Sequence, residues 1–249
     1  MTNTQKKIVG LTAAIALALG VLPAAGAMHI MEGYLPGNMC LLWGAICLPF
    51  LAFGFFSIKK ALAHDRRSIT LLAMAGAFIF VISSLKIPSV TASCSHMTGT
   101  GLGAILFGPS AVSILGVIVL LFQAILLAHG GLTSLGANTF SMAIAGPFVS
   151  FAIYKACQKL KVNKLVGVFL AASIGDLFTY CVTAMQMAVA HPSPEGGVGL
   201  AAAKFLSVFA PTQVPLAILE GILTVVIVIA LESYARPELK AIGFEKEAV

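Results

Sequence analysis

The chain has 249 residues, of which 59% are hydrophobic and only 10% are charged, and its mean hydropathy is +1.01. Soluble domains carry about one quarter charged residues, so this composition excludes a soluble protein and indicates one that crosses a membrane several times. The net charge of +6 does not indicate a nucleic-acid partner, because the basic residues lie in clusters at the ends of apolar segments.

The first predicted element, residues 1–27, is a secretory signal peptide. Two lysines precede an apolar run from Ile8 to Leu22, and a small-x-small cleavage signal ends at Ala27. Cleavage between Ala27 and Met28 leaves a transmembrane domain of residues 28–249, whose new N-terminus lies outside the cytoplasm.

This new N-terminus predicts a metal site. Met28 supplies a free α-amine, and His29 supplies a backbone amide nitrogen and an imidazole. Together with a fourth nitrogen they form a square plane, the geometry of Ni(II) and Cu(II) and, by extension, of low-spin Co(II). The alternative is that Met28-His29 is only a processed end with no ligand role.

Apolar segments after the signal peptide predict an all-α, polytopic membrane domain of about seven helices. The last segment alternatively begins near Lys204, broken by Pro211 and Pro215. In chain order the segments are Cys40–Ile58, Ile69–Leu85, Gly99–Gly108, Ser110–Ala128, Leu132–Tyr154, Leu165–Ala190 and Gln213–Tyr234.

Basic clusters orient these segments. The positive-inside rule places the clusters in the cytoplasm of a bacterial cell, with the mature N-terminus outside the inner membrane and the C-terminus inside. Lys86 is then outside and Lys155 inside, so the chain crosses the membrane an odd number of times between them. Two clear spans lie in this interval, so Gly99–Gly108 must be the third although it is shorter than the roughly 20 residues of a normal span. Alternatively, residues 98–128 cross once as a bent unit. The clusters are Lys59, Lys60, Arg66 and Arg67, then Lys155, Lys159, Lys161 and Lys164, then Arg236, Lys240 and Lys246.

The predicted topology puts every histidine except His64 at or near the outer face. His96 lies in a polar, glycine-rich stretch, residues 93–101, and is a natural fourth nitrogen ligand. His129 opens the polar loop 129–139 and is a candidate for orienting a ligand through hydrogen bonds. The simpler alternative for each is a hydrogen-bonded loop histidine.

Two further sets of residues leave alternatives open. Sulfur-containing side chains near His29 and His96 are soft ligands that could favour Cu(I) over a metal bound by nitrogens. They are Met28, Met31, Cys94 and Met97. Asp176 and Glu220 lie inside apolar segments, where acids are costly, and we expect each to form an interhelical hydrogen bond unless it lines a transport path.

Three segments now carry a resemblance to a known family. Residues Met28 to Pro36, Ser93 to Pro109 and His129 to Phe140 resemble signature segments of the CbiM family, the cobalt-type substrate-binding subunits of energy-coupling-factor transporters. The likeness covers essentially all of the mature chain. It implies a metal site made by the Met28 amine, the His29 amide nitrogen and imidazole, and the His96 imidazole.

The resemblance also implies partners and a substrate. Family members bind Co(II) or Ni(II) and work with a transmembrane coupling subunit, two ATPase subunits and often a small auxiliary membrane subunit. Met31-Glu32 resembles the cobalt members, whereas Pro-Asp is commoner in nickel members. We therefore expect a Co(II)-binding subunit that feeds cobalamin synthesis, or alternatively a nickel-specific subunit of the same kind.

The sequence favours a dependent transporter subunit over an enzyme. It contains neither a G-x-x-x-x-G-K-[ST] phosphate loop nor an H-E-x-x-H motif, so we expect no ATPase of its own, no catalytic residues and no resident cofactor. The remaining alternative is a secondary metal permease driven by protons through Asp176 and Glu220.

Overall fold

The computed structural model describes residues 29–64, 68–88 and 94–244. The predicted signal peptide of residues 1–27 and the cleavage point between Ala27 and Met28 lie outside these residues. Met28, the predicted source of the amine ligand, does so as well.

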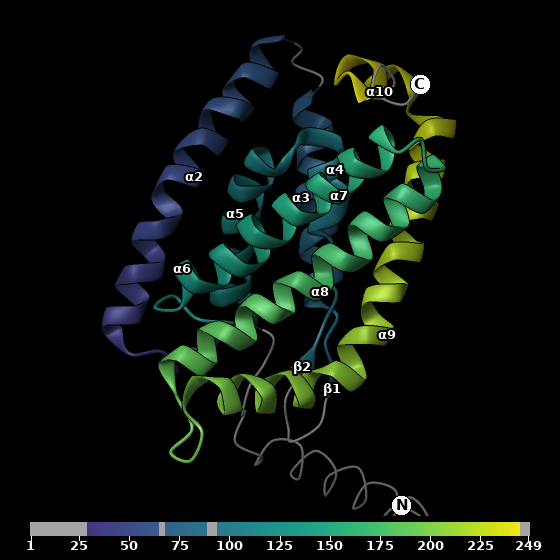
Figure 1. Ribbon diagram of the computed structural model, residues 1–249. Coiled ribbons are helices and arrows are strands. Elements are labelled where there is room, and N and C mark those ends of the chain that lie inside the picture. The colour runs from purple at the N-terminus through teal and green to yellow at the C-terminus, as the bar shows by residue number, and fades with distance from the viewer. Residues whose placement is uncertain (1–28, 65–67, 89–93, 245–249) are drawn as a thin grey trace, which may run out of the picture.

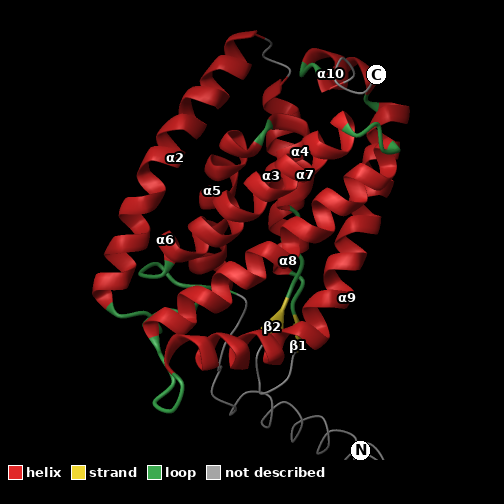
Figure 2. Cartoon of the chain, viewed as in Figure 1, coloured by secondary structure: helices red, strands yellow, loops and turns green. Residues whose placement is uncertain are grey.

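The described chain is a bundle of helices, with one short pair of strands at the lower end in Figures 1 and 2. The strands β1 (Ile87–Pro88) and β2 (Cys94–Ser95) pair antiparallel. The longer helices are α2 (Gly37–His64), α3 (Ser68–Ser84), α5 (Pro109–Leu127), α7 (Gly146–Lys159), α8 (Lys164–Ala190) and α9 (Gly197–Tyr234). The shorter ones are α4 (Thr100–Phe107), α6 (Leu135–Asn138), the π-helical η2 (Thr139–Ala145) and α10 (Arg236–Ala241).

The helical, multi-pass character predicted from composition is confirmed. Helices long and apolar enough to cross a membrane are Gly37–Ala63, Pro109–Leu127, Leu135–Lys159, Lys164–Ala190 and Gly197–Tyr234, and Ile69–Ser84 is a shorter apolar helix. With α4 these make seven apolar segments in the predicted order, but the number of complete crossings and the orientation of the termini stay predictions.

The short helix α4 is the innermost element of the bundle. Every residue from Thr100 to Leu106 is buried, as expected for a short helix packed among others. Its glycines allow the close packing: a Cβ on Gly101 would lie 2.9 Å from the Cα of Ala172 in α8. The loop that leads into α4 is therefore held deep in the bundle.

Helix α9 differs from its prediction. It begins at Gly197, well before both predicted starts, Gln213 and Lys204, and contains Pro211 and Pro215 within one helix. Each proline removes one hydrogen bond and bends a helix without having to end it. In Figure 1, α9 crosses the lower end of the bundle and then turns to run up beside α8.

Candidate metal centre

The segment that begins at His29 is anchored inside the bundle by Asn138 of α6. The Ile30 amide donates to the Asn138 side-chain oxygen at 2.8 Å, and the Asn138 amide group donates back to the Ile30 carbonyl at 3.0 Å. The Ser134 hydroxyl donates to the same carbonyl at 2.5 Å. Because both polar groups of Ile30 are bonded to buried side chains, the position of the neighbouring His29 is closely defined.

Two glycines after His129 let the loop 129–134 press against this segment. A Cβ on Gly131 would lie 2.6 Å from the Cα of Glu32, and one on Gly130 would lie 3.5 Å from the Cβ of His29. Gly130 also has a φ of +81°, which favours glycine. The Glu32 carboxylate accepts the Thr133 amide at 3.2 Å, so the loop and the N-terminal segment are bonded as well as packed.

His96 reaches the same point from the other side of the bundle, on the loop between β2 and α4. Its Nδ1 donates to the Met97 carbonyl at 2.8 Å, which leaves the lone pair on Nε2. That lone pair faces Nδ1 of His29 at 2.6 Å.

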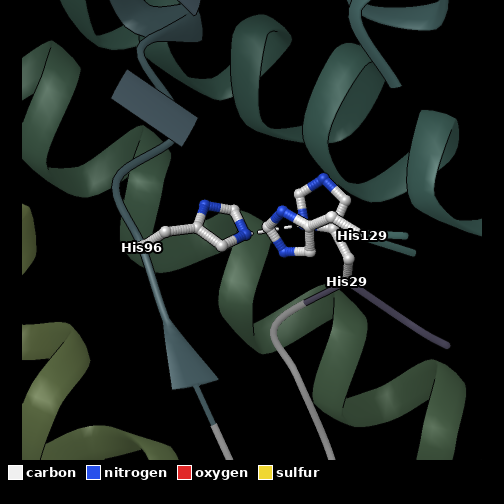
Figure 3. Close-up of side chains that lie close together, drawn as sticks. All are labelled: His29, His96 and His129. Atoms are coloured by element: carbon white, nitrogen blue, oxygen red, sulfur yellow. Dashed lines mark hydrogen bonds between the residues drawn. The ribbon is translucent and has the colours of Figure 1, made fainter. Parts of the chain in front are cut away.

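Three imidazoles meet at this point, as Figure 3 shows. The three ring centroids form a compact triangle, with 4.5 Å between His29 and His96, 4.4 Å between His29 and His129, and 5.0 Å between His96 and His129. One ligand atom from each of the three histidines lies within 4.8 Å of the others. When the histidine, cysteine and acidic side chains of the described residues are compared, these three histidines form the group of three that lies close enough together to hold a metal ion.

Burial favours the neutral form of all three rings. Burial, with the neighbouring His129 and His96 as smaller causes, lowers the pKa of His29 well below its usual value. Burial likewise lowers the pKa of His96 to about 4 and that of His129 to about 2. Neutral imidazoles carry the lone pairs that a metal ion needs, so little proton competition is expected from these side chains.

Several nitrogens in the cluster have no hydrogen-bond partner. They are Nε2 of His29 and both ring nitrogens of His129. Buried polar atoms are normally paired, and leaving one unpaired costs about 1–3 kcal/mol. A cluster of such atoms is typical of a site that a ligand completes.

The structure thus brings His29 and His96 together, as predicted, while Met28 lies outside the described residues. His129 lies beside the site, with its ring against that of His29. His191 does not join the cluster; its Nε2 contacts the Tyr34 carbonyl at 2.8 Å.

Sequence reasoning missed the polar wall beneath the histidines. The small pocket that His29 and His96 line is also lined by Asn138, Ser141, Met142, Thr179 and Thr183. Thr179 and Thr183 are four residues apart in the apolar helix α8, and this spacing could have identified one polar face. Ser141 and Met142 belong to η2, and π-helical turns are often found at functional sites.

The two buried acids lie outside this cluster. Asp176 accepts a hydrogen bond from Gln213 of α9 at 2.6 Å, which confirms the interhelical bond expected for it. Glu220 bonds to the loop before α4, at Thr98 and Gly99, and its side chain also forms a hydrogen bond with Asp176 of α8. The contact with Asp176 bears out the interhelical bond expected for Glu220, and the bonds to the loop add partners that no local sequence pattern indicates.

Comparison with known proteins gives a consistent result. The model of the family "Cobalt uptake substrate-specific transmembrane region", CbiM, matches residues 29–239. A cobalt transport protein CbiM of Lachnoclostridium phytofermentans is 73% identical over 243 residues, covering 98% of this chain and 97% of that one. A cobalt transport protein CbiM of Chlorobium limicola is 59% identical over 244 residues, covering 96% of each.

A solved structure also shares the fold. A crystal structure of a truncated transition metal transporter superposes with a TM-score of 0.73 at 28% identity, covering 83% of this chain and 99% of that chain. The similarity therefore extends from the sequence to the arrangement of the helices.

Proposed function

The chain belongs to the CbiM family of cobalt uptake substrate-specific transmembrane proteins, and from this premise we propose that it captures Co(II) as the substrate-binding subunit of an ATP-driven uptake transporter. The observation that carries the proposal is the 2.6 Å approach of His29 to His96 inside a cluster of buried, neutral imidazoles. The metal ion is the substrate of this protein, not a resident cofactor.

We propose a planar site of four nitrogens. The imidazoles of His29 and His96 supply two, and the Met28 amine and the His29 backbone nitrogen supply the others. This arrangement requires cleavage after Ala27, because the amine of Met28 is otherwise tied up in a peptide bond. The contact between Nδ1 of His29 and Nε2 of His96 supports a site that both imidazoles share.

His129 has a different role in this proposal. Its ring centroid lies 4.4 Å from that of His29, and the two ring planes are inclined by 35°, so the rings pack against each other. A residue packed in this way can close the site from solvent and approach the metal ion from one face, but it does not supply a corner of the plane. We therefore assign His129 to support of the site, as its loop position predicted.

Energy for transport comes from partners in this account. The absence of a phosphate-binding loop from the sequence supports dependence on a transmembrane coupling subunit, two ATPase subunits and a small auxiliary membrane subunit. The mature N-terminus lies outside the inner membrane and the C-terminus inside, as the basic clusters indicate. The imported cobalt supplies cobalamin synthesis.

The test is a competition between metals. Purified protein, cleaved after Ala27, is exposed to equimolar Co(II), Ni(II), Cu(II) and Zn(II), washed, and analysed for metal content. Near-stoichiometric cobalt supports the proposal, and nickel in its place would make this a nickel subunit of the same kind. Absence of both cobalt and nickel would overturn the proposed site.

A further inference from the structure

Glu220 of α9 bonds to the loop that carries His96, besides its contact with the Asp176 carboxyl group of α8. The carboxylate accepts three hydrogen bonds from the loop: from the Thr98 amide at 2.6 Å, the Thr98 hydroxyl at 2.9 Å and the Gly99 amide at 3.0 Å. Glu220 is fully buried, so these bonds are not weakened by competing solvent.

The preceding turns of α9 hold the rest of the same loop. The Gln213 amide donates to the His96 carbonyl at 3.3 Å and to Asp176 of α8 at 2.6 Å. The hydroxyls of Ser95 and Thr212 lie 2.8 Å apart. One helix therefore bonds the loop before, at and after the predicted metal ligand.

The loop has no regular backbone structure of its own. Residues 96–99 belong to no helix or strand, and Gly99 has a φ of +68°. Gly99 also packs closely on α3, where an added Cβ would lie 3.2 Å from the Cα of Ile79. With the backbone path set by these contacts, the His96 ring can reach His29 only while the loop keeps its present course.

We propose that Glu220 is a positioning residue for metal binding, which fixes the His96 loop so that the His96 imidazole completes the site. This inference rests on the proposed function, because it assigns Glu220 a task toward the same metal ion. Glu220 does not contact the metal ion in this account and acts only through the loop.

The first test is Glu220→Gln in the cleaved, full-length protein, with Co(II) binding measured by titration. The backbone N–H groups of Thr98 and Gly99 bond to different oxygens of the Glu220 carboxylate. Glutamine keeps only one of these oxygens, so one buried donor loses its partner. We expect the Kd for Co(II) to rise about tenfold. Thr224→Val is the matched control, because the Thr224 hydroxyl is equally buried on α9 but donates only to the Glu220 backbone carbonyl. Its Kd should stay unchanged.

A double-mutant cycle separates positioning from general stability. If Glu220 acts through His96, then Glu220→Gln should weaken binding in the normal protein but add nothing once His96→Ala has removed the ligand. Cu(II) is the probe for this cycle, because the nitrogens of Met28 and His29 keep measurable affinity for it without His96. Equal effects of Glu220→Gln in both backgrounds would overturn the proposal.

Two further results keep the test decisive. Thr98→Val removes the hydroxyl bond to Glu220 and the weaker bond that the same hydroxyl accepts from Thr100 at 3.2 Å. It should fold even if Glu220→Gln does not, and should raise the Kd about threefold. Unchanged Co(II) binding in both Glu220→Gln and Thr98→Val would overturn this inference alone. Absence of Co(II) binding in the unaltered protein would overturn the proposed function and this inference with it.

Discussion

The two sides of the His96 loop differ in how closely their side chains are bonded. On the imidazole side, Nε2 of His29 and both nitrogens of His129 are buried without a partner. On the backbone side, the Glu220 carboxylate accepts three hydrogen bonds from the loop, and the unpaired atoms there are single oxygens of Gln213 and Asp176, whose side chains are otherwise bonded. Unpaired buried nitrogens cost stability, whereas a saturated carboxylate makes a fixed support. The difference indicates that the imidazole side binds a ligand and that the backbone side fixes the position of the His96 loop.

The largest expected effect comes from removing a ligand on the unpaired side. His29→Ala and His96→Ala should each weaken Co(II) binding by about a hundredfold or more, because each removes a corner of the planar site. Titration of the purified variants measures the loss. His64→Ala is the control, since His64 ends α2 and lies outside the predicted site, and its affinity should not change. Tight Co(II) binding in His96→Ala would contradict the account.

The next effect tests the anchor of the N-terminal segment. Asn138→Ala removes the two bonds to the Ile30 backbone and should raise the Kd for Co(II) about tenfold, since both Ile30 groups then lose a buried partner. Asn138→Asp keeps the acceptor for the Ile30 amide but loses the donor to the Ile30 carbonyl, so its Kd should lie between that of the normal protein and that of Asn138→Ala. If Asn138→Ala binds as tightly as the normal protein, the anchor has no part in the site.

A smaller effect is expected where the loop after His129 touches the N-terminal segment. Gly131→Ala places a Cβ 2.6 Å from the Cα of Glu32, so the segment that carries His29 must shift. We expect about a fivefold rise in the Kd for Co(II), measured by the same titration. Gly199→Ala is the matched control, because nothing lies within 4 Å of a Cβ there. Equal affinities of the two variants would show that this contact does not position His29.

The smallest effect separates His129 from the planar ligands. His129→Ala should raise the Kd for Co(II) only about threefold, because its ring packs against that of His29 without supplying a corner of the plane. A loss as large as that of His96→Ala would make His129 a ligand and the site three-imidazole rather than planar. The visible absorption of the Ni(II)-loaded variant would then change with it.

Local sequence features predicted one side of this comparison far better than the other. His29 and His96 follow from the chemistry of a terminal Met-His pair and from the topology that places both at one face. The buried short helix follows from the parity of crossings, since Gly99–Gly108 alone could supply the missing segment. Each of these inferences needs only short segments and the positions of charges.

The supports could not be predicted in the same way. The bonds of Glu220 to Thr98 and Gly99 join residues more than a hundred positions apart, and only the packing of α9 beside the loop creates them. The early start of α9 at Gly197 was missed because Pro211 and Pro215 also read as helix ends. Thr179 and Thr183 line the pocket only because α8 turns that face inward.

The central claim is that the metal ion binds to a free terminus through Met28 and His29. It is tested most directly by blocking cleavage after Ala27, so that the protein keeps residues 1–27, and titrating this uncleaved protein with Co(II). The Met28 nitrogen then belongs to a peptide bond and its free amine is lost, whereas the sequence from His29 onward is unchanged. The account predicts loss of high-affinity binding comparable to that of His96→Ala. Unchanged affinity in the uncleaved protein would contradict it.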